Sequence, residues 1–280
     1  MSAACLAMTI LAAVPVSITP GRPFQQRMAL SILPPRTYLT APALLLDLAQ
    51  HSTATSADQQ AGADSCTTLR RTTFGADGDR VGTVTVVRVL HPDGSGLLLE
   101  HSRFGTSTSG GGWTRTVFTA GQLLAGIAEP LPDDPRALAA AVTEATAGSG
   151  SSAAMQAAVV ADLASLRVLD APQRRAVLRL LATLPSSTIL GQGGAGLGEP
   201  MIGARFGDGT PVSIDLWFTT TGRLAVITHT DTRNGVPRIR TDVLHSARCD
   251  PDNGLPRLQR FPDGSGETWA VRLPRMIGPQ

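Results

Sequence analysis

The sequence predicts an α+β protein in which helices cover one face of a curved antiparallel sheet, a half-open barrel. Three observations lead to this fold class. Strand-like runs separated by turn signals fill residues 67–118, helical periodicity fills 119–184, and strand-like runs return over 188–245. Strands grouped on both sides of grouped helices are typical of α+β folds, and the strand–helix–strand succession of a parallel sheet does not occur.

The composition limits the classes of function. The 280 residues are 42% hydrophobic and 16% charged, which provides enough apolar material for a sizeable core. The net charge is only +2 and aromatic residues make up 4%, so the chain lacks the basic footprint and the stacking surface of a nucleic-acid binder. All 24 basic residues are arginine, which excludes a Schiff-base lysine and a Walker-type phosphate loop.

The first 21 residues are apolar and uncharged. We expect residues 1–21 to be a signal or membrane-anchor segment and residues 22–39 a tether, although arginines follow the apolar stretch and none precedes it. A buried N-terminal helix is the alternative. A domain over 40–247 and a Pro/Gly/Arg-rich extension over 248–280 complete the chain. We therefore expect an extracytoplasmic protein, either membrane-anchored or secreted after signal cleavage.

The first predicted elements are a helix over 41–52 and an antiparallel meander. Thr40 is the expected N-cap of the helix, and Pro42 lies in its first turn. Asp-Gly turns then separate runs that are rich in valine, threonine and leucine. The predicted strands of this meander are 67–74, 81–90, 96–104 and 113–118.

Helical segments fill the middle of the chain. Asp134 precedes Pro135 and Asp170 precedes Pro172, and an aspartate cap followed by proline in the first turn marks a helix start. The last of these helices has one apolar face, and Arg174 is placed on its polar face. The predicted helices are 119–127, 135–147, 153–167 and 171–184.

A second meander follows the helices. Residues 212–218 alternate between apolar and polar side chains, as a strand with one buried face does. Asn234-Gly235 is a strong hairpin signal, and Pro237 indicates that the strand after it has a frayed start or lies at an edge. The predicted strands are 188–190, 201–206, 212–218, 224–231, 236–245 and 271–273.

Cys66 and Cys249 form an even pair once Cys5, in the apolar N-terminal stretch, is set aside. In an exported protein such a pair indicates a disulfide, which would close a long loop worth about 4 to 5 kcal/mol. Two unrelated buried thiols are the alternative, because the sequence does not show whether the Cα atoms come within about 7 Å.

No catalytic or metal-binding constellation is visible, so we predict no catalytic residue, metal or cofactor. No Gly-x-Ser-x-Gly elbow precedes a helix, and most carboxylates have local roles in turns and helix caps. Glu100 on a strand and Glu144 on a helix have no such role, which leaves a carboxylate-dependent hydrolase open. The histidines lack the spacing of metal ligands; they are His51, His91, His101, His229 and His245.

Gly191, Gly193 and Gly196 match the Gly-x-Gly-x-x-Gly pattern of a dinucleotide-binding turn. That turn needs a helix after it, whose N-terminus holds the pyrophosphate. Here a strand and a hairpin are predicted to follow. We therefore expect a glycine-rich connection between neighbouring strands and no nucleotide at Gly191–Gly196.

Apolar strand residues could line a groove on the concave face of the sheet. An ordinary filled core is the alternative for each of them. The candidates are Val84, Val86, Leu97, Leu99, Leu216, Phe218 and Val226.

Three segments of the sequence resemble a group of actinobacterial membrane-anchored extracytoplasmic proteins that are often encoded beside extracytoplasmic-function sigma factors. The segments are 131–142, 169–191 and 214–230. The resemblance covers residues 40–247, and the apolar N-terminus matches the anchor of the group. It implies the half-open barrel of LolA-type lipoprotein carriers and RseB-like sigma regulators. No catalytic residue is known in the group.

These observations favour a non-enzymatic, membrane-tethered extracytoplasmic domain that binds a lipid-like ligand or a protein partner, in envelope sensing or sigma-factor regulation. A secreted carboxylate-dependent hydrolase and a purely structural envelope protein are the alternatives.

Overall fold

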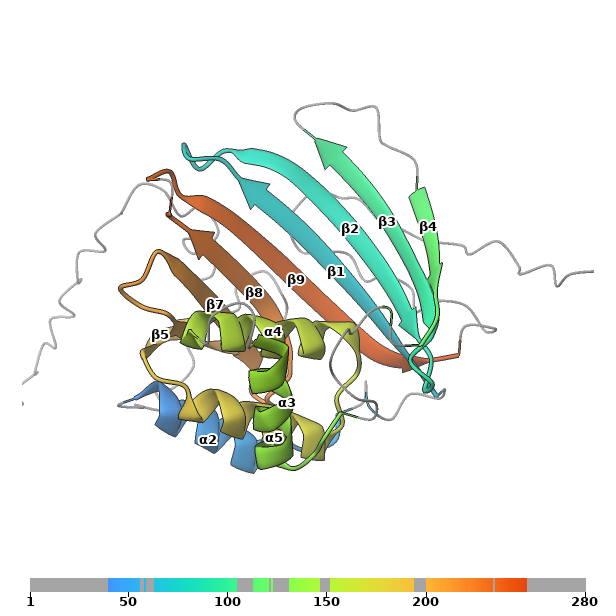
Figure 1. The fold of residues 1–280 in the computed structure, drawn as a ribbon, viewed down its shortest axis with the longest axis horizontal. Helices are drawn as coiled ribbons and strands as arrows, with labels where there is room; N and C mark the ends of the chain where they lie inside the picture. Colours follow the sequence, from blue (N-terminus) through green and yellow to red (C-terminus); the bar gives the residue numbers. More distant parts are fainter. Residues whose placement is uncertain are drawn as a thin grey trace, which may run out of the picture.

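The computed structural model describes residues 40–55, 58, 63–104, 113–120, 122, 131–146, 152–193, 200–233 and 235–250. The predicted anchor, tether, C-terminal strand and most of the helix at 119–127 lie outside these residues. Within them the fold class is confirmed: nine antiparallel strands form one open, curved sheet with helices on one face (Figure 1). None of the helices in the described part is long and apolar enough to cross a membrane.

The sheet joins the two predicted meanders side by side. The strand order is β4-β3-β2-β1-β9-β8-β7-β6-β5, so the first meander forms one half and the second forms the other. The strands are β1 (Asp64–Phe74), β2 (Arg80–Leu90), β3 (Gly96–Phe104), β4 (Trp113–Phe118), β5 (Ser187–Gly193), β6 (Met201–Phe206), β7 (Val212–Thr219), β8 (Leu224–Asp231) and β9 (Arg238–Cys249).

The strand β9 lies at the centre of the sheet, between β1 and β8. Of the two alternatives drawn from Pro237, the edge strand is therefore wrong, whereas a frayed start agrees with a strand that begins at Arg238 and not at 236. The proline stands one residue before the strand begins, where its missing N–H takes no part in the ladder. At its other end β9 continues to Cys249, beyond the predicted end at 245.

Four helices lie in the described part: α2 (Ala41–His51), α3 (Pro135–Thr146), α4 (Ala153–Leu166) and α5 (Ala171–Thr183). Their predicted limits are confirmed to within one residue. Thr40 caps α2, and the side chain of Asp170 caps α5 by accepting a hydrogen bond from the Gln173 N–H. Asp134 accepts a hydrogen bond from the Ala137 N–H in the first turn of α3. These local hydrogen bonds explain why the helix starts could be predicted.

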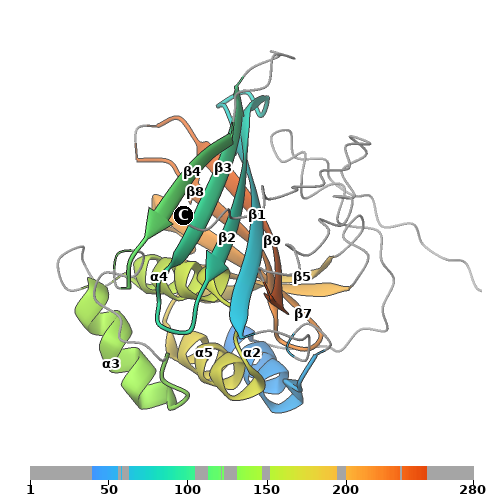
Figure 2. The same cartoon turned by 90° about the vertical axis from the view of Figure 1, so that its right-hand side faces the viewer.

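The helices are gathered at one end of the sheet (Figures 1 and 2). The helix α4 lies directly against the sheet, in contact with β1, β6, β7 and β8, and α5 packs against α2 and α3. We call the face of the sheet that α4 contacts the inner face, and the opposite one the outer face. Strands β1 to β3 and β9 extend beyond the helices (Figure 1).

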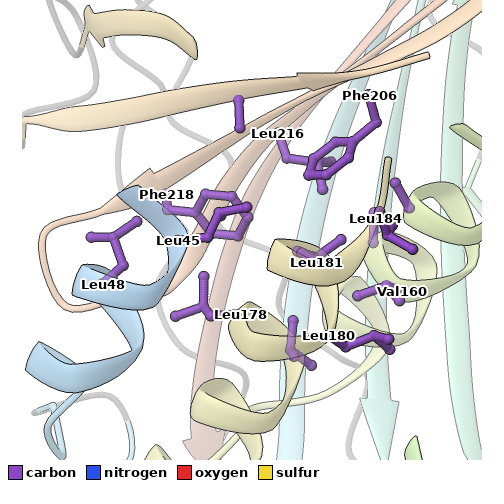
Figure 3. Close-up of a cluster of buried hydrophobic side chains, with 14 of the residues drawn as sticks. Leu45, Leu48, Val160, Leu178, Leu180, Leu181, Leu184, Phe206, Leu216 and Phe218 are labelled. Carbon is purple, nitrogen blue, oxygen red and sulfur yellow. The ribbon is translucent and has the colours of Figure 1, made fainter. Parts of the chain in front are cut away.

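The main core fills the space between the helices and strands β6 to β8. Leucines of α2 and α5 meet aromatic and aliphatic side chains of the sheet in this space (Figure 3). The labelled members are Leu45, Leu48, Val160, Leu178, Leu180, Leu181, Leu184, Phe206, Leu216 and Phe218. Burial of this apolar surface is the main force that holds the helices on the inner face.

A disulfide joins Cys66 at the start of β1 to Cys249 at the end of β9. Their Cα atoms are 5.8 Å apart, and 183 positions of sequence separate them. On the outer face the bridge packs against Val89 and Leu97. It therefore ties together the two strands at which the first and second meanders meet.

Loss of this bridge should destabilise the domain. We expect Cys66→Ser to lower the free energy of unfolding by about 4 kcal/mol, because the unfolded chain regains the entropy of a long open loop. Urea unfolding followed by circular dichroism measures the loss. Cys249→Ser and the double variant should lose the same amount, since each removes the same bond. Losses that add in the double variant would show that the two thiols act separately.

Two adjacent leucines of α2 test how this helix is held. Leu45 is fully buried, whereas Leu46 is 45% exposed. Leu45→Ala should lower the free energy of unfolding by about 2 to 5 kcal/mol because it leaves a cavity. Leu46→Ala, with the same chemical change and helix propensity, should cost about 0.5 kcal/mol or less. Equal losses in thermal unfolding would contradict the packing described above.

Candidate functional site

The predicted groove residues do not share one face of the sheet. In the ladder, Val84 lies opposite Arg71 and Val86 opposite Leu69, which places both valines on the inner face. Leu97 packs beside the disulfide on the outer face, and Val226 packs there against Trp217. Side chains alternate between faces, so the strand register decides which residues meet.

Of the seven predicted groove residues, Val84, Val86, Leu216 and Phe218 lie on the inner face, and Leu97, Leu99 and Val226 lie on the outer face. The single groove that was predicted is therefore wrong. Leu216 and Phe218 are part of the filled core beneath the helices. The apolar inner-face residues of β6 to β8 are thus covered by the helices, whereas Val84 and Val86 are not part of that core.

Next to that core, the inner face carries a group of charged side chains that we call the inner strip. Arg240 lies opposite His229, and Asp242 lies opposite Arg71, so side chains of β1, β8 and β9 adjoin on this face. The sheet residues of the strip, apart from Asp242, are half-buried, whereas Asp162 of α4 is exposed. The inner strip consists of Arg71, Arg88, Glu100, Asp162, His229, Arg240 and Asp242.

The Arg71–Asp242 pair forms the middle of the inner strip. Arg71 donates from Nε to Oδ1 at 2.9 Å and from Nη2 to Oδ2 at 3.0 Å, so both carboxylate oxygens are used. Hydrogen bonding to Asp242 raises the pKa of Arg71 above its usual value. Because Asp242 is buried, this two-point contact is what keeps a carboxylate stable inside the sheet.

One end of the inner strip is formed by Arg240 and His229. Arg240 Nε lies 3.4 Å from Asp242 Oδ2 in an ion pair, and it makes no hydrogen bond within the described residues. Burial lowers the pKa of Arg240. Burial and the nearby Arg240 charge lower the pKa of His229 to about 4, so its ring is neutral at pH 7. His229 Nε2 also has no hydrogen-bond partner there.

Arg88 forms the other end of the inner strip. Its Nη1 donates to the backbone oxygen of Ser165 on α4 at 3.4 Å, and its Nε has no partner among the described residues. Burial lowers the pKa of Arg88. Glu100 accepts a hydrogen bond from the Ser102 hydroxyl at 3.2 Å. Asp162 lies within electrostatic range of Arg71, Arg88 and Arg240.

The inner strip can bind polar groups more readily than it can perform chemistry. Arg88, His229 and Arg240 each hold a buried nitrogen atom that makes no hydrogen bond within the described residues, while their side chains as a whole are half-buried. A hydrolase would need a second carboxylate with Glu100; Asp242 is paired with Arg71, and burial raises the pKa of the third carboxylate of the strip, Asp162. Within the described residues, no three His, Cys, Asp or Glu side chains gather as metal ligands.

The remaining candidates from the sequence lie apart from the inner strip. Glu144 is exposed on α3. His91 Nδ1 is 3.0 Å from Asp64 Oδ1, and the His101 ring lies 5.2 Å from the Trp113 ring on the outer face. His51 contacts the Asp47 carboxylate within α2. Of the five histidines, His229 alone belongs to the inner strip.

Sequence reasoning missed the inner strip, although one signal for part of it was present. His229 and Arg240 are equally spaced about the Asn234-Gly235 turn, so pairing the hairpin through that turn places them opposite each other. No comparable signal identifies Arg71 or Arg88. Their strands join the second meander through a pairing between distant parts of the chain.

Arg174 is not on a solvent-facing surface, which corrects its predicted placement on a polar helix face. It is 3% exposed, and its guanidinium group donates to both carboxylate oxygens of Asp58 at 2.8 and 2.9 Å. It also donates to the Ser52 hydroxyl. Arg174 thus anchors the segment after α2 to α5 and has no donor to spare for a ligand.

The glycine motif lies partly within β5. This strand includes Gly191 and Gly193 and pairs antiparallel with β6, while Gly196 lies outside the described residues. Gly191 has a φ of +95°, a conformation that favours glycine. The next described element is the strand β6, so the helix N-terminus that a pyrophosphate requires is not found in the described part of the chain after this motif.

Comparisons with known proteins show only weak structural similarity. No family model and no curated protein matches the chain. The MucA/MucB complex of Pseudomonas aeruginosa matches 76% of this chain and 59% of the compared chain, at 15% identity and a TM-score of 0.30. This chain therefore spans less than two thirds of that one.

Two further structures match at similar coverage of this chain. The match to a LolA superfamily protein from Nitrosomonas europaea covers 78% of this chain and 98% of that protein's chain, with 9% identity and a TM-score of 0.21. The match to a DUF1329 family protein from Desulfovibrio piger covers 75% of this chain and 92% of that protein's chain, with 8% identity and a TM-score of 0.18. At these scores the similarity carries no argument about function, which must come from this chain's own geometry.

The buried His229 makes stability depend on pH. Its pKa is lower in the folded chain than in the unfolded chain, so acid favours unfolding: the stabilisation is complete above pH 6.5 and is lost as the pH falls toward 4. The loss should reach about 3 kcal/mol at most. Urea unfolding at pH 7.5 and pH 4.5 measures it. In His229→Gln the decrease should be smaller by that amount, and an unchanged decrease would contradict the assignment.

Proposed function

We propose that this chain is a non-enzymatic extracytoplasmic domain that binds a protein partner on the inner face of its sheet. The single observation that carries the proposal is the inner strip. It places half-buried guanidinium, imidazole and carboxylate side chains beside the helices, which cover only part of the inner face.

A protein partner fits this surface better than a lipid-like ligand does. An acyl chain needs an apolar groove, and the apolar inner-face residues of β6, β7 and β8 are covered by side chains of the helices. What adjoins it is charged, with arginine and carboxylate groups side by side. Such mixed charge is usual where one protein surface recognises another.

An extracytoplasmic location is supported by the Cys66–Cys249 bridge, because disulfides persist in oxidising compartments. Membrane tethering through residues 1–21 rests on the apolar composition of that segment. Membership of the actinobacterial group, and with it a role in envelope sensing or sigma-factor regulation, rests on the resemblance of the sequence segments.

Site-specific photocrosslinking in cells tests the proposal. A photoreactive benzoylphenylalanine at Ser102, half-buried on the inner face next to Glu100, should yield a discrete adduct whose mass and peptides identify a protein. The same residue at Val117, which is 65% exposed on the outer face of β4, should not yield that adduct. Equal capture at both positions, or an acyl lipid as the adduct at Ser102, would contradict the proposal.

Glu100→Gln separates binding from hydrolysis. If Glu100 were a catalytic carboxylate, a hydrolytic activity of the wild-type chain would disappear in this variant without loss of folding. For a binding domain, the purified wild-type chain should show no turnover in a screen of ester and glycoside substrates. The Ser102 adduct should still form in the variant.

A further inference from the structure

We infer that the free edge of β4, the side of this strand that faces away from β3, binds an extended segment of a partner protein as an added strand. The segment carries an acidic residue between two apolar ones. This edge lies apart from the inner strip, so the inference goes beyond the proposed function and concerns a second ligand. It depends on the unpaired backbone of β4, on the way its two ends are held, and on the order of its side chains.

The strand β4 ends the sheet with its backbone open to another chain. Within the described residues it pairs with β3 alone. Every residue from Trp113 to Val117 is exposed. An edge strand presents a row of unpaired N–H and C=O groups, and these groups can pair with a strand of another chain. Their spacing selects an extended polypeptide, whose own N–H and C=O groups repeat at the same interval.

The opposite edge of the sheet is protected in ways that β4 is not. The ladder of β5 shifts register between Ile189 and Gly191, where Gly191 has a φ of +95°, and β5 also contacts α2. Bulges and covering helices are two means by which proteins prevent the addition of a strand at an edge. The β3–β4 ladder has no register shift, and β4 contains no proline. The edge of β4 is therefore able to accept a strand.

Both ends of β4 are held in place by side chains. At one end Phe118 is buried opposite Gly96, where a Cβ atom would come within 2.7 Å of the phenylalanine ring. At the other end the ring of Trp113 lies 5.2 Å from the ring of His101. The backbone between these contacts is already extended. Little conformational entropy is therefore lost at this edge when a ligand strand binds.

The side chains of β4 specify the sequence of the added strand. Trp113, Arg115 and Val117 share the outer face, and the two apolar members are 37% and 65% exposed. Residues that lie directly opposite each other in an antiparallel pair contact through their side chains, and apolar pairs and pairs of opposite charge are favourable. A fitting antiparallel strand therefore places apolar residues opposite Trp113 and Val117 and a carboxylate opposite Arg115.

A second copy of β4 fits this edge less well than an acidic chain does. The antiparallel register that pairs Trp113 of one copy with Val117 of the other also pairs Arg115 with Arg115. Like charges directly opposite each other destabilise a sheet. The charge on β4 thus favours a partner with an acidic residue over self-association.

A short synthetic strand tests the inference. In the probe, threonine alternates with valine, glutamate and valine; its ends are blocked, it carries an uncharged dye, and fluorescence anisotropy measures its saturable binding to the full chain. Two further peptides carry N-methyl groups, one on the threonines and the other on the remaining residues. Alternate residues of a strand direct their N–H groups to the same edge. One methylated peptide should therefore bind as the probe does, and the other at least about tenfold more weakly.

Exchange of the two charges tests the predicted pairing. Arg115→Glu should weaken binding of the probe about fivefold, because it places two carboxylates opposite each other. A peptide with lysine in place of the glutamate should bind Arg115→Glu about fivefold more tightly than it binds the wild-type chain. A loss of folding would not produce such a gain, and circular dichroism checks the fold of the variant.

Two exposed valines provide a matched control. Val117 is 65% exposed on β4, and Val236 is 51% exposed just before β9. Val117→Asp should weaken binding of the probe at least about fivefold, because it places a carboxylate opposite a valine of the peptide and close to its glutamate. Val236→Asp makes the same change away from β4 and should alter the affinity less than about twofold.

Other outcomes would overturn the inference. Equal effects of the two N-methylation patterns would do so, as would equal binding of the probe to Val117→Asp and to the wild-type chain. A wild-type dimer that Val117→Asp dissociates, with no binding of the probe, would make a second copy the occupant instead. The partner of the inner strip is to be captured at Ser102 and not at Val117, so absence of probe binding would overturn this inference and leave the proposed function intact.

Discussion

The pairing of β1 with β9 is the constraint on which the rest of the structure depends. All eleven residues of β1 pair with β9, although the two strands come from opposite ends of the described chain. This ladder joins two meanders that would otherwise be separate small sheets. On the outer face the Cys66–Cys249 bridge closes one end of it, and on the inner face the Arg71–Asp242 ion pair crosses it. A shift of one residue would place each of these side chains on the wrong face.

The ladder also decides how the inner face is divided. The helices bury the apolar residues of β6, β7 and β8, and their core is completed by the protein's own leucines. Arg71, Arg240 and Asp242 lie on the neighbouring strands, at the boundary of that core. In the proposed function, this boundary is where a partner would contact the protein.

Much of the fold could be predicted because its signals are local. The N-caps at Thr40 and Asp170 and the Asn234-Gly235 hairpin depend on residues a few positions apart. Of the predictions that needed contacts between distant segments, the Cys66–Cys249 bridge agrees with the structure, whereas the groove and the placement of Arg174 were wrong. The predicted apolar groove combined Val86 of the inner face with Leu97 and Val226 of the outer face. Arg174 was predicted to face solvent, but its guanidinium group donates hydrogen bonds to Asp58 and Ser52.

The sequence by itself determined the fold class, the limits of the described helices and the separation of the strands into two meanders, because periodicity, capping and turn chemistry act over short distances. The tertiary structure alone decided that β1 pairs with β9, which side chains share a face across that pairing, and how the arginines of three strands form one inner strip. Those features follow from the register of β1 against β9, and register is a relation between segments that no local pattern encodes.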